Sequence, residues 1–174
     1  MIKIQETKHC DSRALNEGEE LTEKAVKYDT ELHIEAVQKC GDFFRDMIKG
    51  QFKEHDHTKL GDNLSEFTEA LRSRLKNDEF KNLPWWKKHL EERHHLNDKV
   101  PEDVNLIDVI EMICDCVSAG MARTGKAYDV TLSEKVLKKA FDNTVELLKK
   151  NIEVEKPDEK DEAMKLFGLD KRGN

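Results

Sequence analysis

The sequence has no long apolar run, few helix-breaking residues and little aromatic content. No stretch of its 174 residues approaches the roughly 20 consecutive apolar residues that a membrane-spanning helix needs, so a membrane span is excluded. Three prolines and eight glycines are too few for collagen-like or Gly/Pro-rich disordered chains. Aromatic residues make up only 6% of the chain, so aliphatic side chains must dominate its core.

A basic excess is also missing. The chain has 30 Lys and Arg against 37 Asp and Glu, which gives a formal net charge of −7. Nonspecific nucleic-acid binders usually present a basic face, so a nucleic-acid partner is not expected. A membrane-surface role is disfavoured for the same reason. The acidic balance still allows a local basic pocket for one phosphate group.

The cysteines do not form a structural motif. Cys10, Cys40, Cys114 and Cys116 include no CxxC pair, which disfavours a four-cysteine zinc site. The N-terminal segment MIKIQETKHCDSR has no apolar signal core, so we expect a cytoplasmic protein with reduced thiols. Because Cys114 and Cys116 lie in an apolar run, buried structural roles are favoured over nucleophilic ones.

Helical periodicity is the main pattern that is present. Apolar residues recur at spacings of three and four in several segments, and no strand pattern competes with them. The segments are 30–50, 64–75, 85–97, 103–119 and 133–148. Gly50, Gly120 and Gly125 mark expected helix ends, and Pro84 suits a first turn.

The sequence therefore predicts an all-α, single-domain helical bundle. Residues 1–30 are expected to form an irregular N-terminal arm and residues 31–152 the helical domain. Residues 153–174 are expected to form a charged linker and a short C-terminal tail helix, over 163–169. The apolar segment 103–119 and the Trp85–Trp86 pair suit either the core or a homodimer interface.

Six of the seven histidines lie between positions 33 and 95, and the sharpest cluster is Glu54-His55-Asp56-His57-Thr58-Lys59. An adjacent His and Asp can bind one divalent ion if both side chains turn inward. Taken alone, the dipeptide is more often a polar helix end. Two further groups strengthen the metal interpretation: His33 upstream, and His89, His94 and His95 downstream.

Each group also has an ordinary structural interpretation. His33 could be a core histidine, and the segment WWKKHLEERHHL could be a solvated helix face anchored by its tryptophans. On one continuous helix, His89 and His94 would point about 140° apart. Either that helix ends near Arg93 or only some of these histidines are ligands.

Two carboxylates lie in the most apolar segment. Glu111 and Asp115 are four residues apart and so share one helix face. A buried carboxylate is costly unless it is paired or binds a metal, so these two acids are more informative than exposed ones.

This order of residues resembles the HD superfamily of metal-dependent phosphohydrolases. The matching positions are His33, His55 with Asp56, and Asp115, and HDHTK resembles the HDxxK variant of branches that hold two metals. The wider pattern, with its Trp-rich segment and Arg93-His94-His95, resembles a small uncharacterised family from phages and bacteria. The resemblance covers roughly His33 to Arg123 and implies an HD-like fold.

The resemblance also implies a site and a reaction. His33, His55, Asp56 and Asp115 would hold a first divalent ion, with His89 and His94 or His95 holding a second; Mn, Zn, Fe, Co and Ni all suit such ligands. A metal-activated water would attack the phosphorus of a nucleotide or another small phosphate ester. Lys59, and in second place Arg93, would bind the phosphate group of the substrate. Glu66 or Glu111 would act as the general base.

Two alternatives remain open from the sequence. Some HD-type proteins with the HDxxK variant bind two irons and oxidise small substrates, so this resemblance also allows a dinuclear iron oxygenase. The third interpretation is a non-catalytic phage or host interaction protein with a vestigial metal site.

Overall fold

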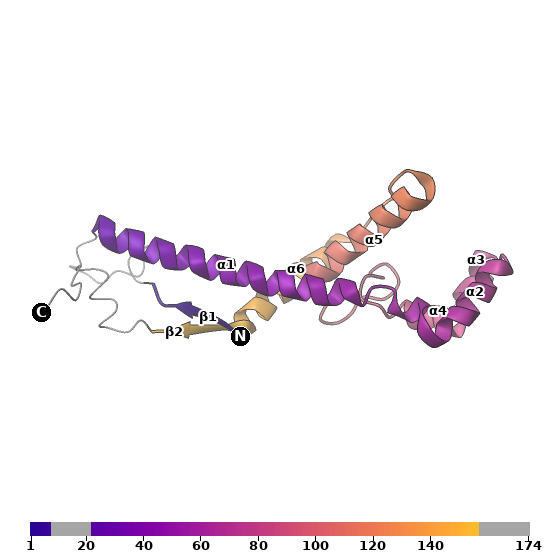
Figure 1. Cartoon of the computed structure of the whole chain (residues 1–174), viewed down its shortest axis with the longest axis horizontal. Coiled ribbons are helices and arrows are strands. Elements are labelled where there is room, and N and C mark those ends of the chain that lie inside the picture. Colours follow the sequence, from indigo (N-terminus) through magenta and orange to yellow (C-terminus); the bar gives the residue numbers. More distant parts are fainter. Residues whose placement is uncertain (8–21, 157–174) are drawn as a thin grey trace, which may run out of the picture. The chain divides into compact units, whose positions relative to one another are not determined.

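The computed structural model describes residues 1–7 and 22–156, and it confirms that the chain is mostly helical (Figure 1). The chain divides into two compact units. Unit 1 comprises residues 1–45 and 148–174, and unit 2 comprises residues 46–147. The boundaries fall inside the helices α1 (Glu23–Lys53) and α6 (Glu134–Asn151). Within the described ranges, none of the helices has the length and apolar character of a membrane span.

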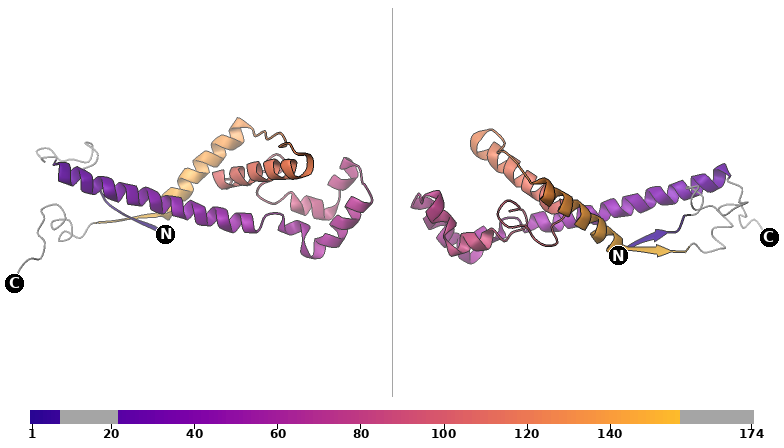
Figure 2. Two further views of the ribbon diagram at one scale, coloured as in Figure 1. Left: turned by 45° about the horizontal axis from the view of Figure 1, so that its top comes forward. Right: turned by 180° about the vertical axis from the view of Figure 1, so that it is seen from behind.

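Unit 1 contains a small parallel sheet, although no strand was expected from the sequence. β1 (Ile2–Gln5) pairs with β2 (Ile152–Glu155), and the two strands run side by side in Figures 1 and 2. Ile2 is buried, and the Lys3 ammonium contacts the Glu155 carboxylate at 2.5 Å. Four-residue strands are too short to show a clear alternation, and each lacks a neighbouring partner in the sequence.

The ends of α1 and the position of β2 differ from the element boundaries predicted from the sequence. Helix α1 begins at Glu23, within the segment that was expected to be an irregular arm, and it continues past Gly50 to Lys53. A single glycine costs a helix only about 1 kcal/mol, which the contacts of the flanking residues can offset. At the other end, 152–155 form a strand instead of a linker. The predicted tail helix over 163–169 lies outside the described residues.

Unit 2 holds the end of α1 and most of the remaining helices. They are the 3-10 turns η2 (His57–Lys59) and η3 (Gly61–Asn63), then α2 (Leu64–Arg72), α3 (Asn77–Lys81), α4 (Pro84–His89), α5 (Leu106–Thr124) and the start of α6. After α5, the chain reverses into α6 through the loop 125–133, which Figure 2 shows clearly. Gly125 ends α5 in the left-handed conformation, as its position in the sequence predicted.

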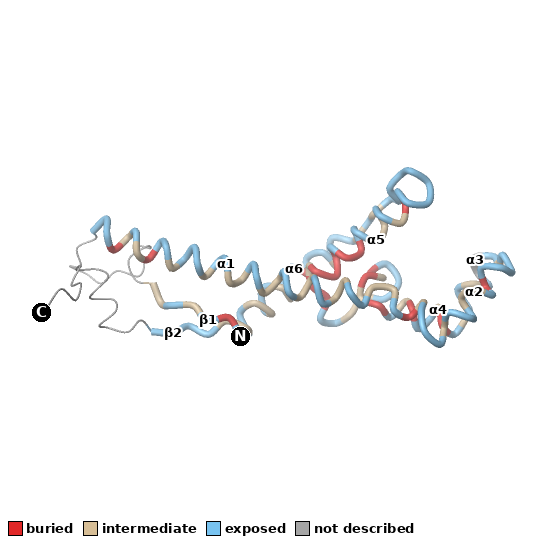
Figure 3. The backbone as a smooth tube through the Cα atoms, viewed as in Figure 1, coloured by how far each residue is buried: buried red, intermediate tan, exposed pale blue. Residues whose placement is uncertain are grey.

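The core of unit 2 forms around α5. Figure 3 shows that the buried stretches concentrate in the loop before α5 and on the first half of that helix. The central cluster consists of Leu96, Val104, Val109, Met112 and Ala140. Asn105 caps α5 by accepting a hydrogen bond from the Ile107 N–H at 2.8 Å. The most apolar predicted helix is therefore central to the core, as expected.

Helix α4 is much shorter than the predicted helix over 85–97. Pro84 occupies its first turn as expected, but the helix ends at His89. Tight turns follow, in which the N–H groups of Glu91 and Glu92 donate to the carbonyls of Lys88 and His89. This early end removes the angular conflict between the histidines that a continuous helix would impose.

Candidate metal centre

The His55–Asp56 pair lies in a sharp turn directly after α1. Asp56 adopts the left-handed conformation, with φ 57° and ψ 17°, which Asp and Asn tolerate better than most residues. The N–H groups of Asp56 and Thr58 each donate to the Glu92 carboxylate at 2.9 Å. A single carboxylate from another part of the chain therefore holds this turn.

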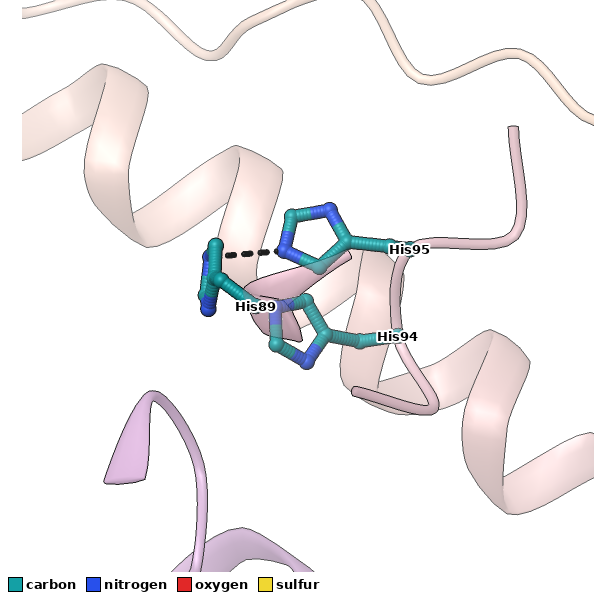
Figure 4. Close-up of side chains that lie close together, drawn as sticks. All are labelled: His89, His94 and His95. Carbon is teal, nitrogen blue, oxygen red and sulfur yellow. Dashed lines mark hydrogen bonds between the residues drawn. The ribbon is translucent and has the colours of Figure 1, made fainter. Parts of the chain in front are cut away.

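Three imidazoles meet beside the turn. His89 comes from the last turn of α4, whereas His94 and His95 come from the loop that follows it (Figure 4). His89 and His94 are buried. The Nε2 atoms of His89 and His95 are 2.8 Å apart, the contact drawn as a dashed line. The sequence alone left open which of His94 and His95 faces the site, and the structure brings both into the cluster.

Asp56 adds an oxygen to these histidines. Its Oδ1 lies 3.6 Å from His89 Nε2 and 3.8 Å from His94 Nε2. Asp56 Oδ1 and His94 Nε2 are buried and have no hydrogen-bond partner among the described residues. Zinc ligands at about 2.0–2.2 Å in a tetrahedron lie roughly 3.3–3.6 Å from one another. The 3.6 Å separation falls within this range, whereas 3.8 Å lies above it and the 2.8 Å between His89 Nε2 and His95 Nε2 lies below it, so an ion would need small shifts of these side chains. An ion would satisfy both unpartnered atoms.

A second set of ligand atoms lies on the other side of Asp56. His55 Nε2 is 3.5 Å from Asp115 Oδ1 and 3.8 Å from Asp56 Oδ2. Asp56 thus presents one carboxylate oxygen to each set. Three groups have ligand atoms close enough for one ion: His89, His94 and His95; His55, His94 and Asp115; and Asp56, His89 and Glu92. The donors suit one or two divalent transition-metal ions.

Glu111 supports the cluster from α5. It is buried, it accepts a hydrogen bond from Gln51 Nε2 at 2.6 Å, and its other oxygen lies 2.9 Å from His55 Nδ1. Burial raises the pKa of Glu111, but hydrogen bonds from His94, Gln51 and His55 outweigh it and lower the pKa below its usual value. Because the ionised carboxylate only accepts, His55 Nδ1 carries the proton and His55 Nε2 stays available to a metal.

The histidines differ in their electrostatic environments. Burial lowers the pKa of His94, but the hydrogen bond and charge of Glu111 reverse this effect and raise it overall. Burial, followed by the nearby His94 and His89, lowers the pKa of His95 to about 3. Burial and then Lys59 lower the pKa of His89. His89 and His95 are therefore neutral near pH 7, the form in which imidazole binds a metal.

Lys59 lies at the edge of the cluster. Its ammonium donates to Asp56 Oδ2 at 2.7 Å. Burial raises the pKa of Asp56, but this hydrogen bond and the charge of Lys59 lower it overall. Lys59 is thus held next to the ligand atoms of the cluster.

Arg93 is already engaged by carboxylates. Its Nε and Nη2 atoms donate to the two oxygens of buried Asp108 at 2.7 and 2.8 Å, and Nη1 donates to Asp103 at 3.0 Å. Asp108 also accepts from the Asn105 N–H at the start of α5. These bonds give Arg93 a structural role in holding the His94–His95 loop against α5.

A cavity of about 340 Å³ opens next to the cluster. Its walls include Thr58 and His94 from the cluster, together with the cationic residues Lys88 and Arg93. A smaller hollow of about 170 Å³ is lined by His55 and by residues from the middle of α5, among them Asp115. The larger cavity is at the small end of the range for ligand pockets, about 300–1,000 Å³.

Two predicted site residues are not brought into this cluster. His33 is exposed on the part of α1 that belongs to unit 1, and Glu66 is exposed on α2. Neither belongs to the metal-capable groups found among the described residues. By contrast, His55, Asp56, His89, His94 and Asp115 all do.

Glu92 is the functional candidate that the sequence analysis missed. It is buried, contacts the turn at Asp56 and belongs to one of the three groups. Within the run Glu91-Glu92-Arg93 it has no periodic or motif signal that distinguishes it from its exposed neighbour. Its spacing of three from His89 was the available signal, since the two residues would share one face of the helix predicted over 85–97.

Comparisons of the chain with protein-family models, with curated proteins and with solved structures found no match. The geometry of unit 2 therefore carries the functional argument by itself.

Proposed function

We propose that unit 2 is an HD-like domain that binds one or two divalent transition-metal ions and hydrolyses a nucleotide or another small phosphate ester. The observation that carries this proposal is the pair of buried, unpartnered atoms, Asp56 Oδ1 and His94 Nε2, which are 3.8 Å apart beside His89 and His95. Buried polar atoms are rarely left unsatisfied, and a metal ion satisfies both. His55 and Asp56 of the HDHTK motif belong to the metal-capable groups of the same cluster.

The ligands fall into two sets that share one carboxylate. His89, His94, His95 and Asp56 Oδ1 would hold one ion, and His55, Asp115 and Asp56 Oδ2 would hold another. When bound, such ions lower the pKa of a coordinated water and offset charge on phosphoryl oxygens. Glu111 keeps the His55 proton on Nδ1, so that Nε2 faces the ligand set.

Other residues of this chain suit the binding of a phosphate ester. Lys59 places a cation at Asp56, where it would contact a phosphoryl oxygen. Lys88 contributes a positive charge to the cavity wall, which also contains Glu54 and Glu91. The Trp86 ring packs against two of the proposed ligands, with ring centroids 5.1 Å from His89 and 6.2 Å from His95.

The test begins with metal content. We expect the purified wild-type protein to carry one or two transition-metal ions per chain, measured by elemental analysis. Asp56→Ala and His94→Ala should each lower metal content at least tenfold, because each removes a central ligand atom. His57→Ala is the matched control, since this neighbouring histidine is exposed and is expected to leave metal content unchanged.

The reaction is tested with the metal-loaded protein and a panel of nucleotides and phosphate esters. Release of inorganic phosphate that is lost in Asp56→Ala, with an unchanged circular dichroism spectrum, supports hydrolysis. The rival dinuclear iron oxygenase predicts two irons per chain and oxygen consumption without phosphate release. A wild-type protein that binds none of these metals would refute the metal site itself and favour a non-catalytic role.

A further inference from the structure

We propose that Glu92 is a positioning residue that shapes the metal site through Thr58 and the Asp56 turn without binding the metal itself. This inference rests on the proposed metal site and assigns a role to a buried acid outside the HD-like motif. The assignment is not obvious, because Asp56, His89 and Glu92 have ligand atoms close enough to share an ion.

The first argument is that the oxygens of Glu92 are already in use. Oε2 accepts from the Asp56 N–H at 2.9 Å, and Oε1 accepts from the Thr58 N–H at 2.9 Å and from the Thr58 hydroxyl. Three hydrogen bonds leave little of the capacity of a carboxylate, about four lone-pair sites, for a metal. A metal would have to share an oxygen that already accepts at least one of these hydrogen bonds.

The second argument concerns the conformation of Asp56. A left-handed residue followed by a turn directs successive N–H groups toward a common point, which makes a small anion site. Here the Glu92 carboxylate occupies that point. It thereby stabilises the backbone conformation from which Asp56 presents its two oxygens to the two ligand sets.

The third argument concerns the His89 proton. The Thr58 oxygen lies 2.7 Å from His89 Nδ1, and the single hydroxyl proton of Thr58 points to Glu92. The hydroxyl must then accept from His89, so the imidazole carries its proton on Nδ1. With its proton on Nδ1, His89 presents an Nε2 lone pair to the ligand set, 3.6 Å from Asp56 Oδ1 and 2.8 Å from His95 Nε2.

The decisive experiment measures cobalt(II) affinity and visible absorption for Glu92→Gln, Thr58→Val and the double variant. Each single variant should weaken cobalt binding about 10- to 100-fold, the usual effect of losing a partner that orients a ligand. Thr58→Ser retains the hydroxyl and should bind cobalt within roughly threefold of wild type, since the hydrogen bonds of the side chain remain. The two losses should be less than additive in the double variant, because Glu92 and Thr58 belong to one hydrogen-bond network that reaches His89.

The spectra distinguish a positioning residue from a ligand. If Glu92 only positions the site, cobalt-saturated Glu92→Gln has the same absorption bands as wild type. Shifted bands at saturation, or additive losses of affinity in the double variant, would overturn the inference and make Glu92 a ligand. Unchanged affinity in both single variants would overturn it as well, although the proposed metal site would stand.

A second measurement does not depend on metal. Long-range ¹H–¹⁵N spectra of the metal-free protein should show His89 protonated on Nδ1 in wild type and Thr58→Ser, but no longer exclusively so in Thr58→Val. A proton on His89 Nε2 in the wild type would contradict the proposed hydrogen-bond chain from His89 through Thr58 to Glu92. If this hydrogen-bond chain is present and cobalt does not bind, the proposed function fails while the arrangement of Glu92, Thr58 and His89 is supported.

Discussion

At the scale of single residues, His95 makes stability depend on pH. Its pKa in the folded protein is about 3, against about 6.5 for an unfolded histidine, chiefly because it is buried. Between these values the unfolded chain binds a proton that the folded chain does not, so acid favours unfolding. The folded state therefore has its full stability, as far as His95 is concerned, above about pH 6.5, and it loses stability as the pH falls toward 3.

We therefore expect the unfolding free energy of the metal-free protein to fall by about 2 kcal/mol from pH 7 to pH 5 because of His95. His95→Asn should remove most of that difference, as measured by urea unfolding in EDTA at both pH values. His57→Asn is the control, because its exposed ring should leave the wild-type pH dependence in place. An equally steep dependence in His95→Asn would show that other groups carry it; His94, whose raised pKa acts in the opposite direction, is not one of them.

Residue chemistry was also the most predictable part of the site. His55, Asp56 and Asp115 were predicted as ligands because the His-Asp pair occurs together with further histidines and with a carboxylate in an apolar helix, and all three belong to metal-capable groups in the structure. Glu92 was missed because its role comes from two backbone N–H groups of a distant turn. A sequence records side chains, whereas such hydrogen bonds appear only after the chain folds.

At the scale of elements, Gly120 shows how tertiary contacts override a local signal. Its position suggested a helix end, yet it lies inside α5. The loop after the helix packs directly on it: an added Cβ would lie 2.4 Å from Tyr128 N and 2.6 Å from Lys126 O. These are backbone atoms, so a side chain there would displace the loop.

Gly120→Ala should therefore destabilise the protein by about 1–3 kcal/mol, the usual cost of overpacking, although alanine is the better helix former. Gly50→Ala is a matched control in α1, where an added Cβ meets nothing within 4 Å. It should stabilise by about 0.5–1 kcal/mol. Thermal unfolding of both variants checks the contrast, and similar changes in both would contradict the packing argument.

The end of α4 is the other element that sequence periodicity misplaced. No glycine or proline stands between His89 and Asn97, so no local signal ended the predicted helix at His89. In the structure, Glu92 and His94 are buried and contact the Asp56 turn and Glu111, and Arg93 binds Asp108. Helix ends depend on such long-range contacts as well as on local propensity.

At the scale of the whole molecule, the division into two units separates His33, in unit 1, from the proposed metal ligands, which all belong to unit 2. The cluster lies entirely within unit 2 and contains two sets of ligand atoms without His33. We expect His33→Ala to leave metal content and cobalt affinity unchanged, because this exposed side chain belongs to unit 1. His55→Ala, measured in parallel, should lower metal content. Loss of an ion in His33→Ala would instead restore the ligand set that the HD resemblance implied.

The sequence by itself determined the helical class, the apolar helix at the centre of unit 2 and most of the residues with metal-binding chemistry. These features depend on side-chain type and on spacings of three or four residues, which are local properties. Three features appear only in the tertiary structure: β1 pairs with β2, α4 ends at His89, and three histidines cluster beside Asp56. Each of these depends on contacts between residues far apart in the chain, and no local pattern encodes them.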